Sequence, residues 1–204
     1  MKGIRYLLVL GLVFSCNSSA KKEASAVASE EKIATSENEM ESKQEEVAKG
    51  TYLCEINGEK WAYTKASGIV STHARTKKRT ALITFTKKLE KGSESIQLHY
   101  DADSFQLIIA SLQLKFKNKE GKPFTCYYYL SEDTKKKSPD GTLSGNIDLS
   151  DPTAASGVAE ILNVNIKYEE EKLLSPENGT ISLKGLQFKG IGYSDMDKLS
   201  NAFK

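Results

Sequence analysis

The sequence predicts an all-β domain, an antiparallel β-sandwich of about nine or ten strands with a short C-terminal helix. From residue 51 onward the chain is a series of short segments in which apolar and polar residues alternate with a period of two. Turn residues separate these segments, and no helical pattern lies between them, which excludes alternating strands and helices. The same pattern is compatible with a closed, lipocalin-like β-barrel, which stays open as the alternative.

Residues 1–15 have the pattern of a bacterial lipoprotein signal peptide. Lys2 and Arg5 precede an apolar run that is too short to span a bilayer. Ser15 and Cys16 end this run, as in the lipoprotein box, where the cysteine receives a diacylglycerol. Acylated Cys16 is then predicted to anchor the mature chain in the outer membrane of a bacterial cell envelope. An ordinary secreted protein with a cysteine at this position is the alternative.

Residues 16–50 are predicted to form a flexible polar tether that carries the domain at 51–204. Glu, Ser, Ala and Lys dominate the stretch, which contains no aromatic residue and too few apolar residues to order a core. As a coil it would reach about 30 Å. The chain has 29 basic and 27 acidic residues, and the excess lies in the signal at Lys2 and Arg5. The mature chain is therefore formally neutral, and we expect no nucleic acid partner.

The domain is predicted to begin with a β-hairpin over residues 51–63. Asn57-Gly58 is the favoured pair for a two-residue type I′ turn. This turn sets a register in which three pairs share the core face: Ile56 with Glu59, Cys54 with Trp61, and Tyr52 with Tyr63.

Five further strands are predicted at 67–72, 80–87, 94–101, 105–117 and 124–130. In the last four of these strands the predicted core-facing residues are Ala81, Ile83 and Phe85; Ile96, Leu98 and Tyr100; Phe105, Leu107 and Ile109; and Phe124, Cys126, Tyr128 and Leu130. Within 105–117 the phase reverses at Leu112, which predicts a β-bulge near Ala110-Ser111.

The last strands are predicted at 142–149, 158–168 and 178–190. In 158–168 the predicted core residues are Leu162, Val164, Ile166 and Tyr168. In 178–190 the phase changes at Gly185, a second candidate bulge. Asp195 is a candidate N-cap, and apolar residues follow it at helical spacing at Met196, Leu199 and Phe203, which predicts the short C-terminal helix.

Cys54 and Cys126 both fall on predicted core faces. Export to an oxidising compartment permits a disulfide between them. Such a bridge would close a loop of about seventy residues and add about 4 kcal/mol on the loop-entropy model. The predicted disulfide has an alternative, in which both residues are buried thiols.

The layout resembles a group of small Bacteroidetes-type lipoproteins. In this group a lipoprotein box and polar spacer precede an all-β domain that opens with a pattern like "INGEKWAY" and closes with strands like "GTLSGNIDL" and "NGTISLKGLQF". The resemblance covers most of residues 51–190 and carries over no catalytic residues. It implies attachment to the envelope, on either the periplasmic or the surface-exposed side of the outer membrane.

The sequence contains no catalytic, cofactor or metal motif, so we expect no enzyme. The two histidines, His73 and His99, lack metal-ligand spacing, and "GTLSG" does not have the spacing of a nucleophile elbow. A hydrolytic set would have to combine a serine with His99 and Asp103. The "DADS" stretch begins like a calcium loop but lacks its glycine and glutamate, and a turn is the simpler interpretation.

Tyr127 and Tyr129 are predicted to point away from the core, where two aromatic rings form a candidate ligand or glycan platform. The predicted function is a membrane-tethered binding or interaction module whose partner is an envelope protein, a glycan or a small hydrophobic ligand. A lipocalin-like carrier of an apolar ligand is the alternative, and a hydrolase is the third hypothesis.

Overall fold

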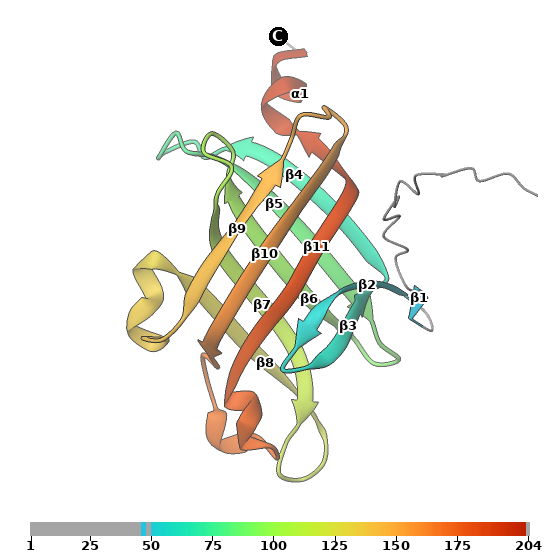
Figure 1. Cartoon of the computed structure of the whole chain (residues 1–204), viewed down its shortest axis with the longest axis vertical. Coiled ribbons are helices and arrows are strands. Elements are labelled where there is room, and N and C mark those ends of the chain that lie inside the picture. Colours follow the sequence, from blue (N-terminus) through green and yellow to red (C-terminus); the bar gives the residue numbers. More distant parts are fainter. Residues whose placement is uncertain (1–45, 48–49, 203–204) are drawn as a thin grey trace, which may run out of the picture. The chain divides into compact units, whose positions relative to one another are not determined.

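The domain is built almost wholly from strands (Figure 1). The computed structural model describes residues 46–47 and 50–202. The strands are β1 (Glu46–Val47), β2 (Gly50–Ile56), β3 (Glu59–Tyr63), β4 (Lys65–Thr72), β5 (Arg79–Lys88), β6 (Ser93–Asp101), β7 (Leu107–Lys117), β8 (Pro123–Ser131), β9 (Thr142–Asp148), β10 (Ala154–Asn165) and β11 (Thr180–Asp195). Three short 3-10 helices, η1 (Glu132–Lys137), η2 (Glu170–Lys172) and η3 (Pro176–Gly179), and the helix α1 (Met196–Ala202) complete the described chain. The first strand lies within the range predicted for the tether, and the prediction for Cys16 lies outside the described residues.

The long strand β11 joins the two layers of the fold. Its first part pairs antiparallel with β10, which continues to β9, and with β2, which continues to β3. Its last residues, Tyr193, Ser194 and Asp195, pair in parallel with β4. From β4 the sheet continues through β5, β6, β7 and β8 in antiparallel order. The sheet is therefore continuous, although it folds back on itself.

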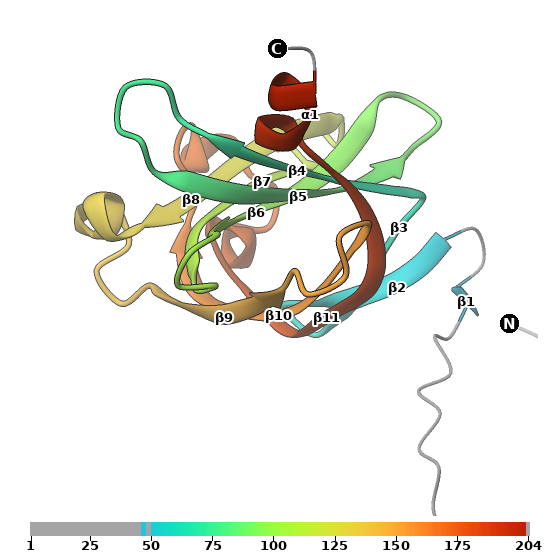
Figure 2. The same cartoon turned by 90° about the horizontal axis from the view of Figure 1, so that it is seen from above.

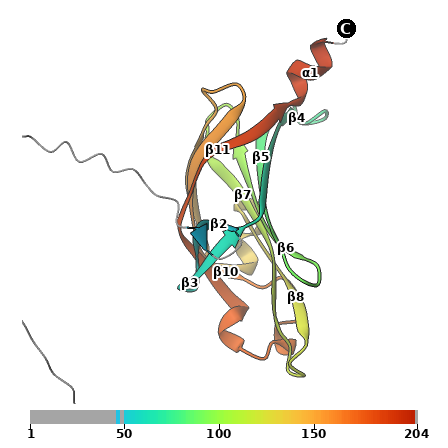
Figure 3. The same ribbon diagram turned by 90° about the vertical axis from the view of Figure 1, so that its right-hand side faces the viewer.

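Strands β4–β8 face β9–β11 across the core, as Figures 2 and 3 show from two directions. The far edges of the two layers are connected by isolated bridges, Gln106 to Asn146 and Tyr128 to Ile166, and not by a ladder. The sheet is therefore open, and the alternative of a closed, lipocalin-like barrel is wrong. The predicted all-β fold with its short C-terminal helix is confirmed.

Large side chains fill the space between the layers. Phe85 and Phe188 meet edge to face with their ring centroids 5.4 Å apart, and the ring of Tyr100 lies 6.3 Å from that of Phe188. Phe85, Tyr100 and Tyr128 are fully buried. The middle of the sandwich is thus packed with side chains, as is usual for a protein core.

The predicted hairpin forms with one change of register. Asn57 and Gly58 both have positive φ, as a type I′ turn requires. The pairs of Ile56 with Glu59 and of Cys54 with Trp61 are confirmed, but Tyr52 faces Ala62 and not Tyr63. The register shifts because β2 has a bulge between Tyr52 and Cys54, where the buried Leu53 is the extra residue.

The bulge in β7 lies earlier than predicted. The register with β6 shifts between His99 and Tyr100, whose partners are Ile109 and Leu107, so the extra residue is Ile108. Ala110 already faces the core, and the predicted position at Ala110-Ser111 is therefore wrong. The prediction failed because Ile109 is apolar although it lies on the outer face. Phe105, predicted to face the core, is exposed.

The phase change at Gly185 is confirmed. This residue has a φ of 64°, which favours glycine, and the β10 register shifts opposite it, between Ala159 and Ile161. A second irregularity in β10 was not predicted. Asn163 also has positive φ, and Leu162 is consequently only half-buried, whereas Ile161 is fully buried.

Polar contacts hold the C-terminal helix on the sheet. Asp195 caps α1, because its Oδ1 accepts a hydrogen bond from the N–H of Asp197 at 3.2 Å, as predicted. Arg79 on β5 donates to Asp195 at 2.7 Å. Thr72 on β4 donates to Asp197 through both its backbone N–H and its hydroxyl. The carboxylates at the helix start thus connect it to two strands.

The apolar residues of α1 contribute little burial. Met196 and Leu199, which share the predicted helical spacing, are both exposed. Phe203 lies outside the described residues. The helix therefore caps the end of β11 without closing the core.

Cys54 and Cys126 are buried free thiols, so the predicted disulfide does not form in the structure. They lie on β2 and β8, which belong to opposite layers and do not pair. Burial raises the pKa of Cys54 to about 12, and burial also raises the pKa of Cys126. The prediction failed because bridged and unbridged cysteines both occupy core-facing positions, so the strand pattern does not distinguish them.

Candidate functional site

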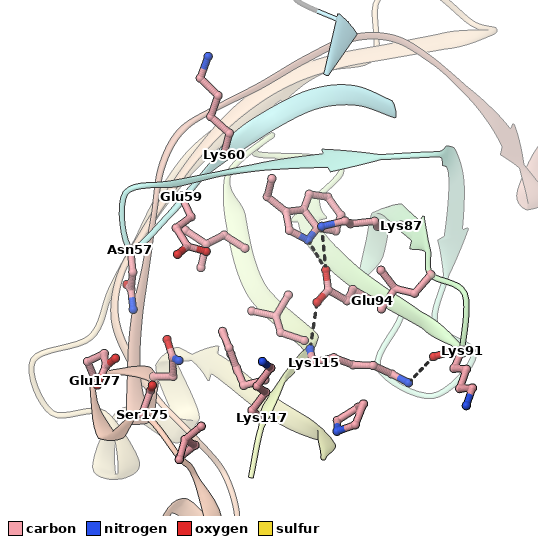
Figure 4. A pocket seen from close by; sticks show the side chains of 18 of the residues that line it. Asn57, Glu59, Lys60, Lys87, Lys91, Glu94, Lys115, Lys117, Ser175 and Glu177 are labelled. Carbon is pink, nitrogen blue, oxygen red and sulfur yellow. Dashed lines mark hydrogen bonds and ion pairs between the residues drawn. The ribbon is translucent and has the colours of Figure 1, made fainter. Parts of the chain in front are cut away.

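A pocket of about 850 Å³ opens at one end of the sandwich (Figure 4). Three parts of the chain meet there: the turn between β2 and β3, the ends of β5, β6 and β7 with their connecting loop, and the segment that contains η3. Side chains line a cavity at this end, whereas they fill the core between the layers elsewhere. Its size lies within the range of small-molecule sites.

The apolar part of the pocket is formed by aromatic and branched side chains. Trp61 comes from β3, Leu114 and Phe116 from β7, and Leu174 from the segment before η3. Leu174 is 49% exposed at the mouth of the pocket. Leu174 and the half-buried Phe116 offer a ligand apolar surface that gains by leaving water, whereas Trp61 and Leu114 are themselves nearly buried.

Glu94 is the central polar residue of the pocket. It lies on β6 with only 8% of its surface exposed. Its Oε2 accepts a hydrogen bond from the indole N–H of Trp61 at 2.9 Å, and its Oε1 accepts one from the backbone N–H of Lys115 at 3.1 Å. The Nζ of Lys87 lies 3.5 Å from Oε2. The carboxylate is thus held by two hydrogen bonds and an ion pair, and it orients the indole ring.

Five lysines line the same pocket: Lys60, Lys87, Lys91, Lys115 and Lys117. Four glutamates line it as well, of which Glu94 is already compensated by its donors. The Nζ of Lys115 donates to the backbone carbonyl of Lys91 at 2.7 Å, which holds these two residues together at the mouth (Figure 4). The pocket therefore combines an apolar wall with a formally positive rim.

The sequence analysis did not single out Glu94, although a signal for it was present. Glu94 has the same strand phase as Ile96, Leu98 and Tyr100, all of which are buried. A carboxylate in phase with core residues indicates a buried charge that needs partners. The pattern could not show which partners these would be, because Trp61 and Lys87 come from other strands.

Tyr127 and Tyr129 lie where the sequence predicts, on the outer face of β8 and away from this pocket. Tyr127 is 47% exposed. Tyr129 is half-buried, and the Nζ of Lys167 lies 5.8 Å from the centre of its ring. Their outward position is confirmed, while their role as a ligand platform stays a prediction.

The two histidines are not brought together with a hydrolytic set. His99 lies between Leu82 and Ile109 on the outer face, where burial lowers its pKa. Asp103 is in a turn in which the side chain of Asp101 accepts hydrogen bonds from the N–H groups of Asp103 and Ser104. His73 contacts Thr76 in an exposed turn. Within residues 46–47 and 50–202, no group of three metal-binding side chains was found.

Comparisons with known proteins do not assign this site. No family model, curated protein or solved structure matches the chain. The resemblance to Bacteroidetes-type lipoproteins therefore stays a prediction. In the part of the chain that the structure describes, no helix has the length and apolar character needed to cross a membrane. The function has to be argued from the pocket itself.

Proposed function

We propose that this protein is a non-catalytic binding module of the bacterial envelope whose ligand occupies the pocket beside Trp61. The observation that carries the proposal is the combination of an apolar wall with a lysine rim around the anchored Glu94–Trp61 pair. A prearranged indole reduces the conformational entropy that a ligand must overcome on binding. Because the core is packed with side chains, a binding site at the end of the sandwich is favoured, and a lumen through its centre is not.

The ligand that suits this pocket is an amphiphile with an anionic group. Trp61, Phe116 and Leu174 would contact its apolar part. Lysines at the mouth, such as Lys91 and Lys117, would face the anionic group. The five lysines outnumber the four glutamates by one, and the pairing of Lys87 with Glu94 leaves this excess unchanged, so an anionic ligand finds more partners than a cationic one.

Attachment to the membrane forms the second part of the proposal. Acylated Cys16 would anchor the chain in the bilayer, and the tether would let the domain move within about 30 Å of it. A binding module held at this distance would meet amphiphiles that leave the membrane. Whether the domain faces the periplasm or the outside does not change this chemistry.

The fluorescence of Trp61 tests the proposal directly, because the chain has one tryptophan. The full chain with Cys16→Ser, which cannot be acylated, is titrated with laurate, dodecyl maltoside and dodecyltrimethylammonium below their micellar concentrations. We expect a saturable change in Trp61 emission that is tightest for laurate, since the alkyl chain of laurate is one methylene shorter than the dodecyl chain of the other two probes and tighter binding must then come from its head group. An unchanged emission with all three probes, together with no heat of binding, would overturn the proposal.

A further inference from the structure

The outer face of strands β4–β8 is a second surface with a chemistry unlike that of the pocket. The ladders align the outward residues of these strands in rows that cross the whole layer. The middle row consists of Ser67, Thr84, Gln97, Ser111 and Tyr129. Neighbouring strands lie about 4.8 Å apart, so each row extends about 19 Å. Figures 2 and 3 show no element lying over the middle of this face.

The rows on either side continue this surface. One consists of Lys65, Thr86, Ser95, Gln113 and Tyr127, and the other of Ile69, Leu82, His99, Ile109 and Ser131. Hydroxyl and amide groups thus fill the first two rows, and a mostly apolar row borders them. The two tyrosines lie next to each other at the β8 end, where Tyr127 is the more exposed.

The face lacks the charge that is common in the rest of the protein. Charged residues make up 27% of the chain, which would place about four of them among fifteen positions. Lys65 is the one Lys, Arg, Asp or Glu in the three rows, and it lies at a corner. The outward positions of the opposite layer, by contrast, include Asp148, Glu160, Lys184 and Lys189, all exposed. Beyond the row of Lys65, the outward positions of the same layer include Lys88 and Lys115, so the charge-poor area is confined to these three rows.

A neutral, hydroxyl-rich polymer complements this surface. Side-chain hydroxyls and amides both donate and accept hydrogen bonds, as sugar hydroxyls do. Tyrosine rings present flat apolar faces with a polar tip, on which the apolar face of a sugar can stack. Among the three rows an anionic polymer meets Lys65 alone, and Lys167 lies over the ring of Tyr129, so charge complementarity favours an uncharged partner over a polyanion such as a nucleic acid.

We propose that the outer face of β4–β8 binds a neutral polysaccharide, with Tyr127 and Tyr129 as its stacking positions. The polymer would lie across the strands along the middle row and end on the tyrosines. This site is separate from the pocket: Ser95 on the outer face and Glu94 in the pocket are adjacent on β6 but point to opposite sides. The inference does not depend on the function proposed for the pocket.

Affinity electrophoresis through gels that contain dextran, laminarin, mannan or xylan tests the inference, with alginate as an anionic comparison. The full chain with Cys16→Ser is compared with the same chain carrying Tyr127→Ala and Tyr129→Ala. The control is Val158→Ala, which removes an exposed apolar side chain from β10 in the opposite layer. We expect at least one neutral polymer to retard the parent, about tenfold weaker binding in the double variant, and no change in the control.

Several results would overturn the inference. These are no retardation by any of the neutral polymers, retardation by alginate alone, or equal retardation of the parent and the double variant. The laurate titration of Trp61 is run on every variant. An unchanged Trp61 response in the double variant shows that it is folded, so a loss of retardation then reports the outer face. If laurate does not change the emission of Trp61 in the parent, the result contradicts the proposal for the pocket and not the proposal for the outer face.

Discussion

The pocket and the outer face of β4–β8 share strands β5, β6 and β7 but differ in almost every property. The pocket is concave and is lined by lysines, glutamates and aromatic side chains, whereas the face is open and nearly free of charge. On β6 the two surfaces take alternate residues, since Glu94 belongs to the pocket and Ser95 to the face. The comparison teaches that the two-residue period of a strand lets one sheet carry two independent chemistries.

The largest expected effect comes from removing the central carboxylate of the pocket. Glu94→Ala leaves the indole N–H of Trp61, the N–H of Lys115 and the ammonium of Lys87 without their acceptor. We expect the free energy of unfolding to fall by about 3 kcal/mol, because the buried indole N–H of Trp61 and the N–H of Lys115 both lose a charged acceptor. Urea titration followed by Trp61 fluorescence measures the change.

Glu94→Gln is the matched variant for this measurement. Its amide oxygen can still accept one hydrogen bond, so the loss should be about 1 kcal/mol. If Glu94→Ala unfolds at the same urea concentration as the parent, the carboxylate does not hold the pocket together as described. Neither variant should change the retardation by neutral polysaccharide while the protein is folded.

A smaller effect is expected at the rim of the pocket. Lys117→Glu reverses a charge that lines the cavity, and we expect laurate to bind about tenfold more weakly, or about 1.4 kcal/mol. Lys119→Glu makes the same charge change two residues away at an exposed position that does not line the pocket. Calorimetric titration with laurate compares them, and an equal loss in both variants would assign the effect to net charge and not to the pocket.

The smallest effect concerns the pH dependence of stability. Burial lowers the pKa of His99, so the unfolded chain binds more protons than the folded one at mildly acidic pH. The contribution of neutral His99 to stability is therefore present above about pH 6.5 and is lost as the pH falls through its folded pKa. His99→Gln should show a flatter decline than the parent in urea titrations from neutral to mildly acidic pH.

His73→Gln is the control for this comparison, since His73 lies in an exposed turn at the end of β4. A decline as steep in His99→Gln as in the parent would exclude His99 as the titrating group. Protonation of His99 would also place a charge on the nearly neutral face. We therefore expect the retardation by neutral polysaccharide to weaken over the same pH interval.

Local patterns predicted the parts of the fold that depend on neighbouring residues. The Asn57-Gly58 turn, the inward phase of Ile96, Leu98 and Tyr100, and the cap at Asp195 all follow from contacts within a few positions. The bulge in β7 was misplaced because Ile109 is apolar on an outward position, where Leu82 and His99 are its neighbours. A side chain's polarity alone does not tell which side of a strand faces the core.

Of the two candidate sites, one follows from local sequence pattern and the other does not. The outward position of Tyr127 and Tyr129 could be predicted, because it follows from alternation with Cys126 and Tyr128. The pocket could not be predicted, because Trp61, Glu94 and Lys115 come from three strands whose order in space is not written in any local pattern. The disulfide was predicted wrongly for a related reason, since strand pattern does not report the distance between β2 and β8.

The sequence by itself determined the all-β class, most strand positions and the core-facing side of the strands without an unexpected bulge, because alternation and turn chemistry act over a few residues. Tertiary structure alone decided that β11 pairs in parallel with β4 and joins the layers, that both cysteines stay free, and that a pocket forms around Glu94. These features arise from contacts between residues far apart in the chain, where packing of the whole core selects one arrangement of strands among many that the local pattern permits.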